Sequence, residues 1–316
     1  MEARVDITKL GKATNGRGTE MAVVTVIIAT LAETARAGQL VRAIRSTRDG
    51  NDQQIEVLVV VNGDRYDGEL VRELSSSDEC RLVQLDQASF PRALSVGVDV
   101  STTPYFSFLD DDDEYLPGAV DLRLRTLEKH PDAALLVTNG YRRKGKIDHP
   151  AMRELDRVEA DPLLALFREN WLPSCGGLFR RAKTPDELFL DVPSLLEWTW
   201  IAYRMADAGR KVVVLNEPTF IINRTNGSQS ASLAYVTSLP ETLHLLRERT
   251  TRPDIRSAVT RHLVQSLYAA SSRCLCEGRS ADAWRFHVQC LKQKGGWRYW
   301  KHTMRLLGLQ RPSWAD

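Results

Sequence analysis

Continuous apolar runs alternate with amphipathic segments through the first half of the chain. Residues 23–29 (VVTVIIA) and 55–61 (IEVLVVV) are rich in β-branched side chains and too continuously apolar for an amphipathic edge, so both are predicted to be buried parallel strands. Between them, Leu40 and Ile44 fall on one face of a helix that ends at Asp49-Gly50. The pattern therefore predicts one β-α-β unit.

The alternation of helix and strand signals continues to residue 140. Pro91 marks a helix start, because the missing N–H of proline has no penalty in a first helical turn. The further helices are predicted around Glu69–Leu74, from Pro91 and over Pro117–His130, and the further strands over Arg81–Leu85, Tyr105–Leu109 and Ala133–Thr138. Residues 22–140 are therefore predicted to form a doubly wound α/β half.

The signals become less regular after residue 146 and purely helical from Thr237 onward. The middle section predicts strands over Gly176–Phe179, Val212–Leu215 and Thr219–Asn223 and a helix over Leu195–Asp207. The last section has breaks at Arg252-Pro253, Gly278 and Gly295-Gly296. We therefore expect an α/β fold with a doubly wound mixed sheet over residues 22–235, an N-terminal extension at 1–21 and a basic α-helical region at 236–316.

Composition indicates a globular chain without an export signal. Of its 316 residues 43% are hydrophobic and 27% are charged, and no apolar stretch approaches the length of a membrane span. Residues 1–21 lack the apolar core of a signal peptide or the pattern of a transit peptide. We expect a cytoplasmic protein.

The five cysteines are odd in number and scattered, which favours reduced thiols over a disulfide framework. A zinc cluster is an alternative interpretation of four residues in one region: Cys274, Cys276, His287 and Cys290. However, Cys-x-Cys is not a usual zinc spacing, and buried cysteines are ordinary in helices, so the reduced, structural interpretation is preferred.

The C-terminal region is basic although the whole chain carries a net charge of only +2. Residues 241–316 contain 14 Lys and Arg and six Asp and Glu, a net +8, which leaves −6 on residues 1–240. Taken as one helix, the tail has an apolar stripe and flanking cations, namely Trp297, Trp300, Met304 and Leu307 beside Arg298, Lys301 and Arg305. Either the stripe meets an anionic membrane, peripherally and on the cytoplasmic side, or it packs on the α/β domain. No nucleic-acid module is recognisable, so we expect no nucleic-acid partner.

An apolar strand delivers four consecutive carboxylates, Asp110–Asp113, to one point of the chain. Adjacent acids repel one another unless a positive charge lies among them, and hard oxygen ligands suit Mg²⁺ or Mn²⁺. Ligands in open α/β sheets bind at the carboxyl ends of strands, which favours a metal site over a solvated acidic turn.

A later carboxylate, Glu197, lies in the apolar and aromatic run 195–200 (LLEWTW) at a predicted helix start. Partial desolvation there would raise its pKa and make it a better proton acceptor near neutral pH. A plain helix-start glutamate, stabilised by the helix dipole, is the alternative. Phosphate-loop, dinucleotide and zincin motifs do not occur in the sequence.

The assembled pattern resembles the family 2 inverting glycosyltransferases, which have the nucleotide-sugar GT-A fold, over residues 23–230. The resemblance is carried by Val26–Thr30, Val59–Gly63 and Pro91–Gly97, by Phe108–Asp113 for the Asp-x-Asp motif, by Leu196–Trp198 for the catalytic motif, and by Glu217-Pro218 and Gly227–Ser230. It implies a nucleotide-sugar half at residues 22–140 and an acceptor half at 141–235.

The resemblance also implies roles for individual residues. Asp110 would contact the ribose or the metal, Asp112 would ligate Mn²⁺ or Mg²⁺ between the diphosphate oxygens, and Glu197 would be the catalytic base where the family usually has aspartate. The implied nucleotide-sugar site comprises Thr30, Leu31, Asn62, Arg92, Asp110 and Asp111, and the implied metal ligands are Asp110 and Asp112.

Three positions depart from the family pattern. Ala29–Ala32 replaces Pro-Thr-Tyr-Asn, so the ring that often stacks on the base is missing. Val61-Asn62 replaces the acidic pair that commonly meets uracil, and Asn226 stands about where many members place a metal-contacting histidine, after Arg224. A UDP-sugar is the favoured donor, although these departures leave the base open.

We therefore expect a metal-dependent inverting hexosyltransferase that moves a sugar from a nucleoside diphosphate to a hydroxyl acceptor, of the kind used in polysaccharide biosynthesis. The acceptor class stays open between a glycan, a lipid-linked acceptor and a small molecule. Two alternatives remain: a nucleotide-sugar-binding module without turnover, and a sugar nucleotidyltransferase, for which residues 30–34 (TLAET) lack the usual phosphate loop.

Overall fold

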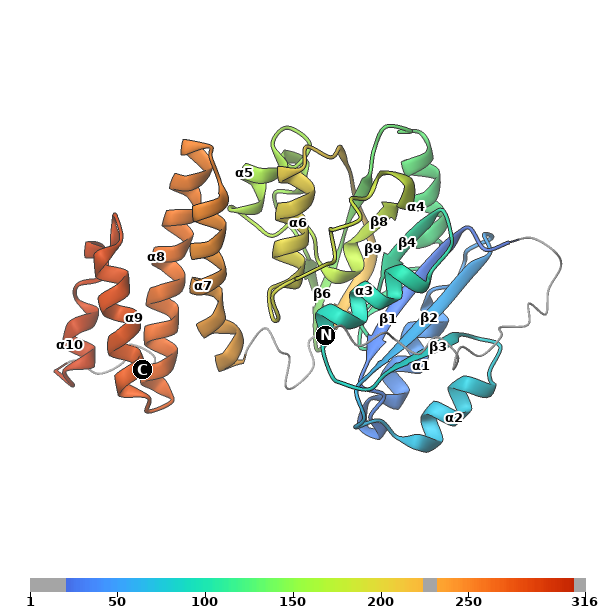
Figure 1. Ribbon diagram of the computed structural model, residues 1–316, viewed down its shortest axis with the longest axis horizontal. Coiled ribbons are helices and arrows are strands. Elements are labelled where there is room, and N and C mark those ends of the chain that lie inside the picture. The colour runs from blue at the N-terminus through green and yellow to red at the C-terminus, as the bar shows by residue number, and fades with distance from the viewer. Residues whose placement is uncertain (1–20, 224–231, 310–316) are drawn as a thin grey trace, which may run out of the picture. The chain divides into compact units, whose positions relative to one another are not determined.

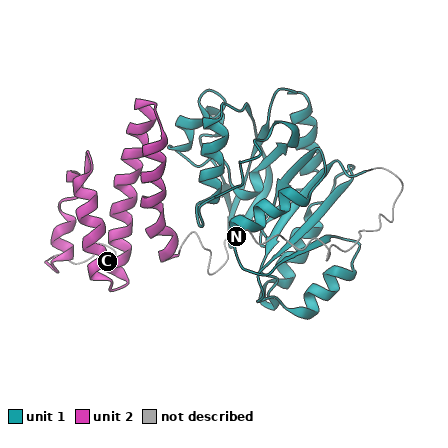
Figure 2. Cartoon of the chain, viewed as in Figure 1, with its two compact units in different colours: residues 1–225 teal, residues 226–316 magenta. Residues whose placement is uncertain are grey.

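The computed structural model describes residues 21–223 and 232–309, which fall into two compact units, residues 1–225 and 226–316 (Figures 1 and 2). The first unit is an α/β domain, and the second consists of helices. The α/β unit is built on one mixed sheet with the strand order β3-β2-β1-β4-β8-β6-β9-β5, and β7 pairs with β6 outside this path. The mixed sheet and the helical C-terminal part agree with the fold class expected from the sequence.

The amino-terminal half contains the parallel part of the sheet (Figure 1). Its strands are β1 (Val24–Thr30), β2 (Ile55–Asn62), β3 (Arg81–Leu85) and β4 (Tyr105–Phe108), and its helices are α1 (Ala37–Ser46), α2 (Gly68–Ser76) and α3 (Phe90–Val100). In the register, Val24 of β1 lies beside Ile55 of β2 and Tyr105 of β4. The carboxyl ends of the three central strands β2, β1 and β4 therefore lie along one edge of the sheet.

The second half of the α/β unit adds strands of mixed direction. They are β5 (Glu114–Tyr115), β6 (Leu135–Lys144), β7 (Ile147–Pro150), β8 (Gly177–Arg180) and β9 (Val212–Asn223), with helices α4 (Ala119–Glu128), α5 (Pro162–Leu166) and α6 (Glu197–Asp207). Strand β8 runs antiparallel to β4 and β6, and β9 runs parallel to β6. Short 3-10 turns lie at Thr34–Arg36, Leu155–Arg157, Ser174–Gly176 and Arg181–Lys183.

Strand β9 differs from the expectation of two separate strands. It runs unbroken from Val212 to Asn223 through Glu217-Pro218, which lies between the two expected strands. Its pairing with β6 shifts register around Asn139, which lies opposite Pro218. An irregularity in the ladder accommodates a proline that cannot donate a ladder hydrogen bond, so the strand continues.

An aromatic cluster fills the core beneath the end of β4. Its members are Phe106, Phe108, Phe179 and Phe189, with neighbouring ring centroids 5.0–6.0 Å apart. All four side chains are buried. Such ring contacts add stability beyond the area they bury, so the strand that leads to the acidic run has a fixed support.

The helical unit comprises α7 (Leu233–Arg249), α8 (Pro253–Cys276), α9 (Ser280–Lys292), a 3-10 turn η7 (Gly296–Tyr299) and α10 (His302–Leu306). Its breaks lie where Pro253, Gly278 and Gly295-Gly296 predicted them. The domain boundary expected after residue 235 falls inside α7, so it needs correction to a point before Leu233. None of the helices within the described ranges is long and apolar enough to span a membrane.

The C-terminal tip, which we define as residues 296–307, is not one α-helix as the stripe analysis assumed. It is the turn η7 followed by α10, although Trp300 and Lys301 between them also have right-handed helical backbone angles. Gly296 begins the tip, and a side chain there would collide with the carbonyl oxygen of Cys290. Close packing on the end of α9 thus requires a glycine and turns the chain into the tip.

Candidate active site

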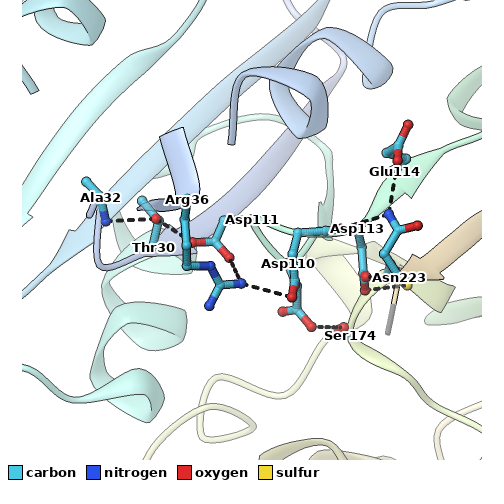
Figure 3. A network of polar contacts seen from close by, with 11 residues as sticks. Thr30, Ala32, Arg36, Asp110, Asp111, Asp113, Glu114, Ser174 and Asn223 are labelled. Carbon is cyan, nitrogen blue, oxygen red and sulfur yellow. Dashed lines mark hydrogen bonds and ion pairs between the residues drawn. The ribbon is translucent and has the colours of Figure 1, made fainter. Parts of the chain in front are cut away.

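The acidic run leaves β4 through a tight turn in which the Asp113 N–H donates to the Asp110 carbonyl, 3.1 Å away. This turn directs adjacent carboxylates to different partners (Figure 3). Asp111 and Asp113 are buried, whereas Asp110 and Asp112 retain partial exposure. The run therefore has two buried members and two partly exposed members.

Asp110 lies beside Ser174, whose hydroxyl donates to Oδ2 at 2.6 Å. Burial is the main reason why the pKa of Asp110 rises to about 7, and the neighbouring charges of Asp112 and Asp111 add to it. The Ser174 hydrogen bond and the Arg36 charge act in the opposite direction. A cation near this carboxylate would favour its ionised form, so the position suits a metal or ribose contact.

Asp111 is held by two groups from the segment that follows β1. The Thr30 hydroxyl donates to Oδ2 at 2.6 Å, and Arg36 Nη2 lies 2.5 Å from Oδ1. Burial raises the pKa of Asp111, while the Thr30 bond and Arg36 lower it. The same Arg36 nitrogen lies 2.9 Å from Asp112 Oδ2, so one guanidinium joins two members of the run. Arg36 was not predictable from the sequence, because no motif marks a lone arginine of this kind.

Asp113 points into the domain and connects β4 to the end of β9. The Asn223 N–H donates to its Oδ1 at 2.9 Å, and the Cys175 thiol lies 3.8 Å from Oδ2. Burial, helped by Asp110 and Asp112, raises the pKa of Asp113 well above its usual range. The Asn223 side chain also donates to the Asp112 carbonyl at 2.8 Å. These bonds indicate a structural role for Asp113.

The two partly exposed carboxylates fit a divalent cation only as part of a shared site. Among the described residues, no group of three or more His, Cys, Asp or Glu side chains is arranged to hold a metal. Asp110 and Asp112 supply two hard oxygen donors, and Mg²⁺ in phosphate-binding sites usually takes one or two carboxylates together with substrate phosphates. Asn226 and Gly227–Ser230, also part of the sequence argument, lie outside the described residues.

The remaining residues expected at the nucleotide site lie at neighbouring strand ends. Thr30 ends β1, Leu31 follows it, and Arg92 lies in the first turn of α3. Asn62 ends β2 and is buried, and its Oδ1 accepts the Ser89 N–H at 2.7 Å, which fixes the residue that caps α3. The strand register therefore brings these groups to the edge that carries the acids, and their contacts with a nucleotide stay predictions.

Glu197 is the first residue of α6 and is only 7% exposed. Burial raises its pKa, although its Oε1 accepts the Leu195 N–H at 2.8 Å. Leu195 has a φ of 75°, in the left-handed region that branched residues rarely adopt. The next ring, Trp198, packs on Phe108 of β4 with centroids 5.1 Å apart. This contact places the start of α6 near the strand that ends in the acids.

A fully buried cation lies behind the acidic run. The guanidinium of Arg123 donates to the Thr219 hydroxyl and the Cys175 carbonyl and lies 4.4 Å from the centre of the Tyr115 ring. It is 1% exposed, and none of its described partners is a carboxylate. Burial raises the pKa of Tyr115, and the nearby charge of Arg123 partly offsets this rise.

The structure favours the reduced interpretation of the cysteines. All five are free thiols. Of the four residues considered for zinc, Cys276 is exposed, His287 Nε2 bonds the Thr303 hydroxyl at 2.8 Å, and Cys290 Sγ lies 3.4 Å from the Val264 carbonyl. These groups have separate partners, in keeping with the absence of a metal-ligand cluster from the described residues.

Solved structures resemble this chain in fold. TarS from S. aureus (residues 1–349), in complex with UDP-GlcNAc, aligns with a TM-score of 0.56 and 16% identity, over 91% of this chain and 80% of TarS. The mannosyltransferase PcManGT from Pyrobaculum calidifontis, in complex with GDP-Man and Mn²⁺, aligns with a TM-score of 0.53 and 15% identity, over 92% of this chain and 86% of that protein. The mixed sheet is therefore of the GT-A class, as the sequence predicted.

Sequence comparison then identifies the family. The glycosyl transferase family 2 pattern matches residues 25–188, which is more than half of the chain. The chain therefore belongs to this family. Uncharacterised glycosyltransferases of Rickettsia conorii and Rickettsia bellii are 29% and 30% identical to it over 106 residues. That match covers 33% of this chain but only 18% and 15% of the rickettsial proteins.

Proposed function

We propose that this chain catalyses metal-dependent, inverting transfer of a sugar from a nucleoside diphosphate to a hydroxyl acceptor. The observation that carries the proposal is that carboxylates of two different kinds lie near the end of one strand, β4. Asp110 and Asp112 are partly exposed at the end of β4, and the buried Glu197 begins a helix whose next residue packs on that strand.

The two groups suit the two charges that develop in such a reaction. The leaving nucleoside diphosphate gains negative charge, and a divalent cation held by Asp110 and Asp112 would stabilise that charge. Glu197, with a pKa raised by burial, would accept the proton of the attacking hydroxyl. One displacement from the opposite side inverts the anomeric carbon.

A nucleotide sugar is the donor that the comparisons support. TarS was solved with UDP-GlcNAc and PcManGT with GDP-Man and Mn²⁺, so both uridine and guanosine donors occur among proteins of similar fold. We infer a UDP-sugar donor, with Thr30, Leu31, Asn62 and Arg92 beside the nucleotide and Asp111 supporting the site. The Oδ1 of Asn62 already accepts from the Ser89 N–H, so Asn62 would contact a base through its side-chain NH₂ group.

The donor proposal can be tested by thermal unfolding with UDP, GDP, ADP and CDP, each with and without Mn²⁺. A bound ligand stabilises the native state by about 2.7 kcal/mol at 100 times its Kd, which gives a clear rise in Tm. We expect the largest rise with UDP and Mn²⁺ together. Equal responses to every nucleotide, or to none, would contradict the assignment.

We also propose that the C-terminal tip binds an anionic membrane surface from the cytoplasmic side. Trp297, Trp300, Met304 and Leu307 recur at three- and four-residue intervals and are 73%, 53%, 36% and 56% exposed. Within the helical unit, these exposed fractions leave the stripe outside the core. Arg298, Lys301 and Arg305 recur at the same intervals on the adjacent side, and aromatic rings beside cations suit an anionic headgroup layer.

A further inference from the structure

Arg36 is the cation that the structure places in the acidic run. Its Nη2 lies 2.5 Å from Asp111 Oδ1 and 2.9 Å from Asp112 Oδ2 (Figure 3 shows the contact with Asp111). The arginine side chain is 36% exposed, whereas the two aspartate side chains are 7% and 18% exposed. The guanidinium therefore reaches the carboxylates from the solvent side of the site.

The turn after β1 brings Arg36 to this position. Ala32 has a φ of 50°, a left-handed conformation two residues after Thr30. This segment is fixed by the Ala32 N–H, which donates to the Thr30 hydroxyl at 2.9 Å, and by the Ala32 carbonyl, which accepts from the Asp67 N–H at 2.9 Å. The 3-10 turn Thr34–Arg36 follows and ends at Arg36. A strained turn at a ligand-binding edge is often related to function.

The two aspartates use this contact differently. Asp111 has one oxygen on Thr30 and the other on Arg36, so both of its oxygens are engaged within the protein. Asp112 contacts Arg36 through Oδ2 and would also be a ligand of the divalent cation. A guanidinium and a divalent cation on one carboxylate repel each other, so each weakens the binding of the other.

We propose that Arg36 competes with the divalent cation for Asp112 and binds the diphosphate of the donor once the cation is in place. The inference rests on the proposed function, its first half on the cation site at Asp112 and its second half on the nucleotide donor. A diphosphate offers an arginine a stronger, multidentate partner than a shared carboxylate oxygen. Donor binding thus removes Arg36 from Asp112, and cation and nucleotide bind with positive coupling. Arg36 holds the site ready for the pair and disfavours the cation alone.

The test measures Mn²⁺ binding by the electron paramagnetic resonance signal of the free ion, without nucleotide, in wild-type protein and in Arg36→Met. Methionine keeps the length and the apolar stem but not the charge. We expect Arg36→Met to bind Mn²⁺ about 10-fold more tightly than wild type and, at saturating Mn²⁺, to bind UDP about 10-fold more weakly. Arg36→Lys should lie between the two, because lysine keeps the charge without the planar fork.

Arg65→Met is the matched control, since Arg65 pairs with Glu33 at 3.5 Å and touches no member of the acidic run among its described contacts. It should leave both affinities unchanged. Equal or weaker Mn²⁺ binding by Arg36→Met would overturn the competition, and unchanged UDP affinity would overturn the diphosphate contact. Absence of UDP binding by wild-type protein would instead remove the proposed function and the second half of this inference, while the Mn²⁺ comparison would still decide the first half.

Discussion

Adjacent aspartates in this protein have distinct chemical surroundings. Asp110 accepts from Ser174, Asp111 from Thr30, and Asp113 from the Asn223 backbone. The donors come from residues far apart in the chain, and each fixes one carboxylate orientation. A change at one aspartate should therefore alter binding, and a change at another should alter stability.

Asp112→Ala should weaken Mn²⁺-dependent UDP binding by about 100-fold and leave the fold intact, since its removal also relieves repulsion within the acidic run. Asp113→Ala should instead lower the free energy of unfolding by about 1–3 kcal/mol, because the Asn223 N–H loses its buried partner. Isothermal titration and urea unfolding of both variants separate the two effects. Wild-type affinity and metal dependence in Asp112→Ala would rule out its role as a ligand.

Glu197→Gln should retain donor affinity and lose turnover by about 10²–10⁴-fold, because the amide keeps the Leu195 hydrogen bond but cannot accept a proton. Burial raises the pKa of Glu197. As the pH is lowered, wild-type activity should therefore begin to fall at a higher pH than the usual titration range of a glutamate. The exposed Glu128 gives the control Glu128→Gln, which should behave as wild type. If Glu197→Gln loses donor binding, the residue belongs to the nucleotide or metal site. If the wild-type protein binds the donor but shows no turnover, the binding-module alternative is supported.

At the scale of elements, the helical unit contains buried histidines whose ring contacts join α8, α9 and α10. His302 Nε2 bonds the Ser271 hydroxyl at 3.0 Å, and its ring centroid lies 5.2 Å from that of His287. The Ser271 hydroxyl donates its hydrogen to the Ala283 carbonyl, so it can only accept from His302. The Nε2 of His302 therefore carries the proton, and its Nδ1 is unprotonated. Nδ1 is buried and has no partner among the described residues. Protonation there would place an unpaired charge between the helices.

Acid should therefore destabilise the helical unit. Burial, with His287 and Arg305, lowers the pKa of His302 from 6.5 to about 4, so the unfolded chain binds the proton more readily. The stabilisation is present above pH 6.5 and is lost as pH falls towards 4, an effect on the order of 1–3 kcal/mol. Urea unfolding at pH 7 and pH 4.5 measures it. His302→Phe should reduce the pH dependence, and His149→Gln, at an exposed position, should not. Equal pH dependence in all three proteins would contradict this origin.

The sequence predicted elements well where periodicity and turn residues agree. The β-branched runs at β1 and β2 and the proline start of α3 were all found. The continuity of β9 was not predictable, because it depends on how the partner strand β6 accommodates Pro218. The position of the acidic run at the end of a strand was predictable, and its role as a binding site stays a prediction. The inward turn of Asp113 and the contact of Arg36 were not, because Asn223 and the turn at Ala32 determine them.

At the scale of the whole molecule, charge is distributed unevenly along the chain, with +8 on residues 241–316 and −6 on residues 1–240. An anionic surface would attract one part and repel the other. The tip also packs through its other side, since Tyr299 stacks on Tyr268 with centroids 4.3 Å apart. Deletion of residues 296–316 would therefore remove structural contacts together with the exposed stripe, and point substitutions give the cleaner test.

Trp297→Ser with Trp300→Ser should reduce binding to phosphatidylserine vesicles on the order of 10-fold or more, with little change in Tm, because both rings are exposed. Raising NaCl from about 50 to 500 mM should weaken wild-type binding, since salt screens the basic side. Co-sedimentation measures both effects, with phosphatidylcholine vesicles and Val288→Ser, an exposed position on α9, as controls. A large drop in Tm of the double variant would instead show that the rings support the helical unit.

The accessibility of the thiols makes selective chemical labelling practical. Burial raises the pKa of Cys80, Cys175, Cys274 and Cys290, so their thiolate forms are scarce at neutral pH, whereas Cys276 is exposed at the end of α8. A maleimide dye should therefore attach at Cys276 without reaching the thiol next to Asp113. A single fluorophore could then be placed on the helical unit without changing the sequence. Energy transfer to a labelled lipid would report the approach of this unit to a membrane.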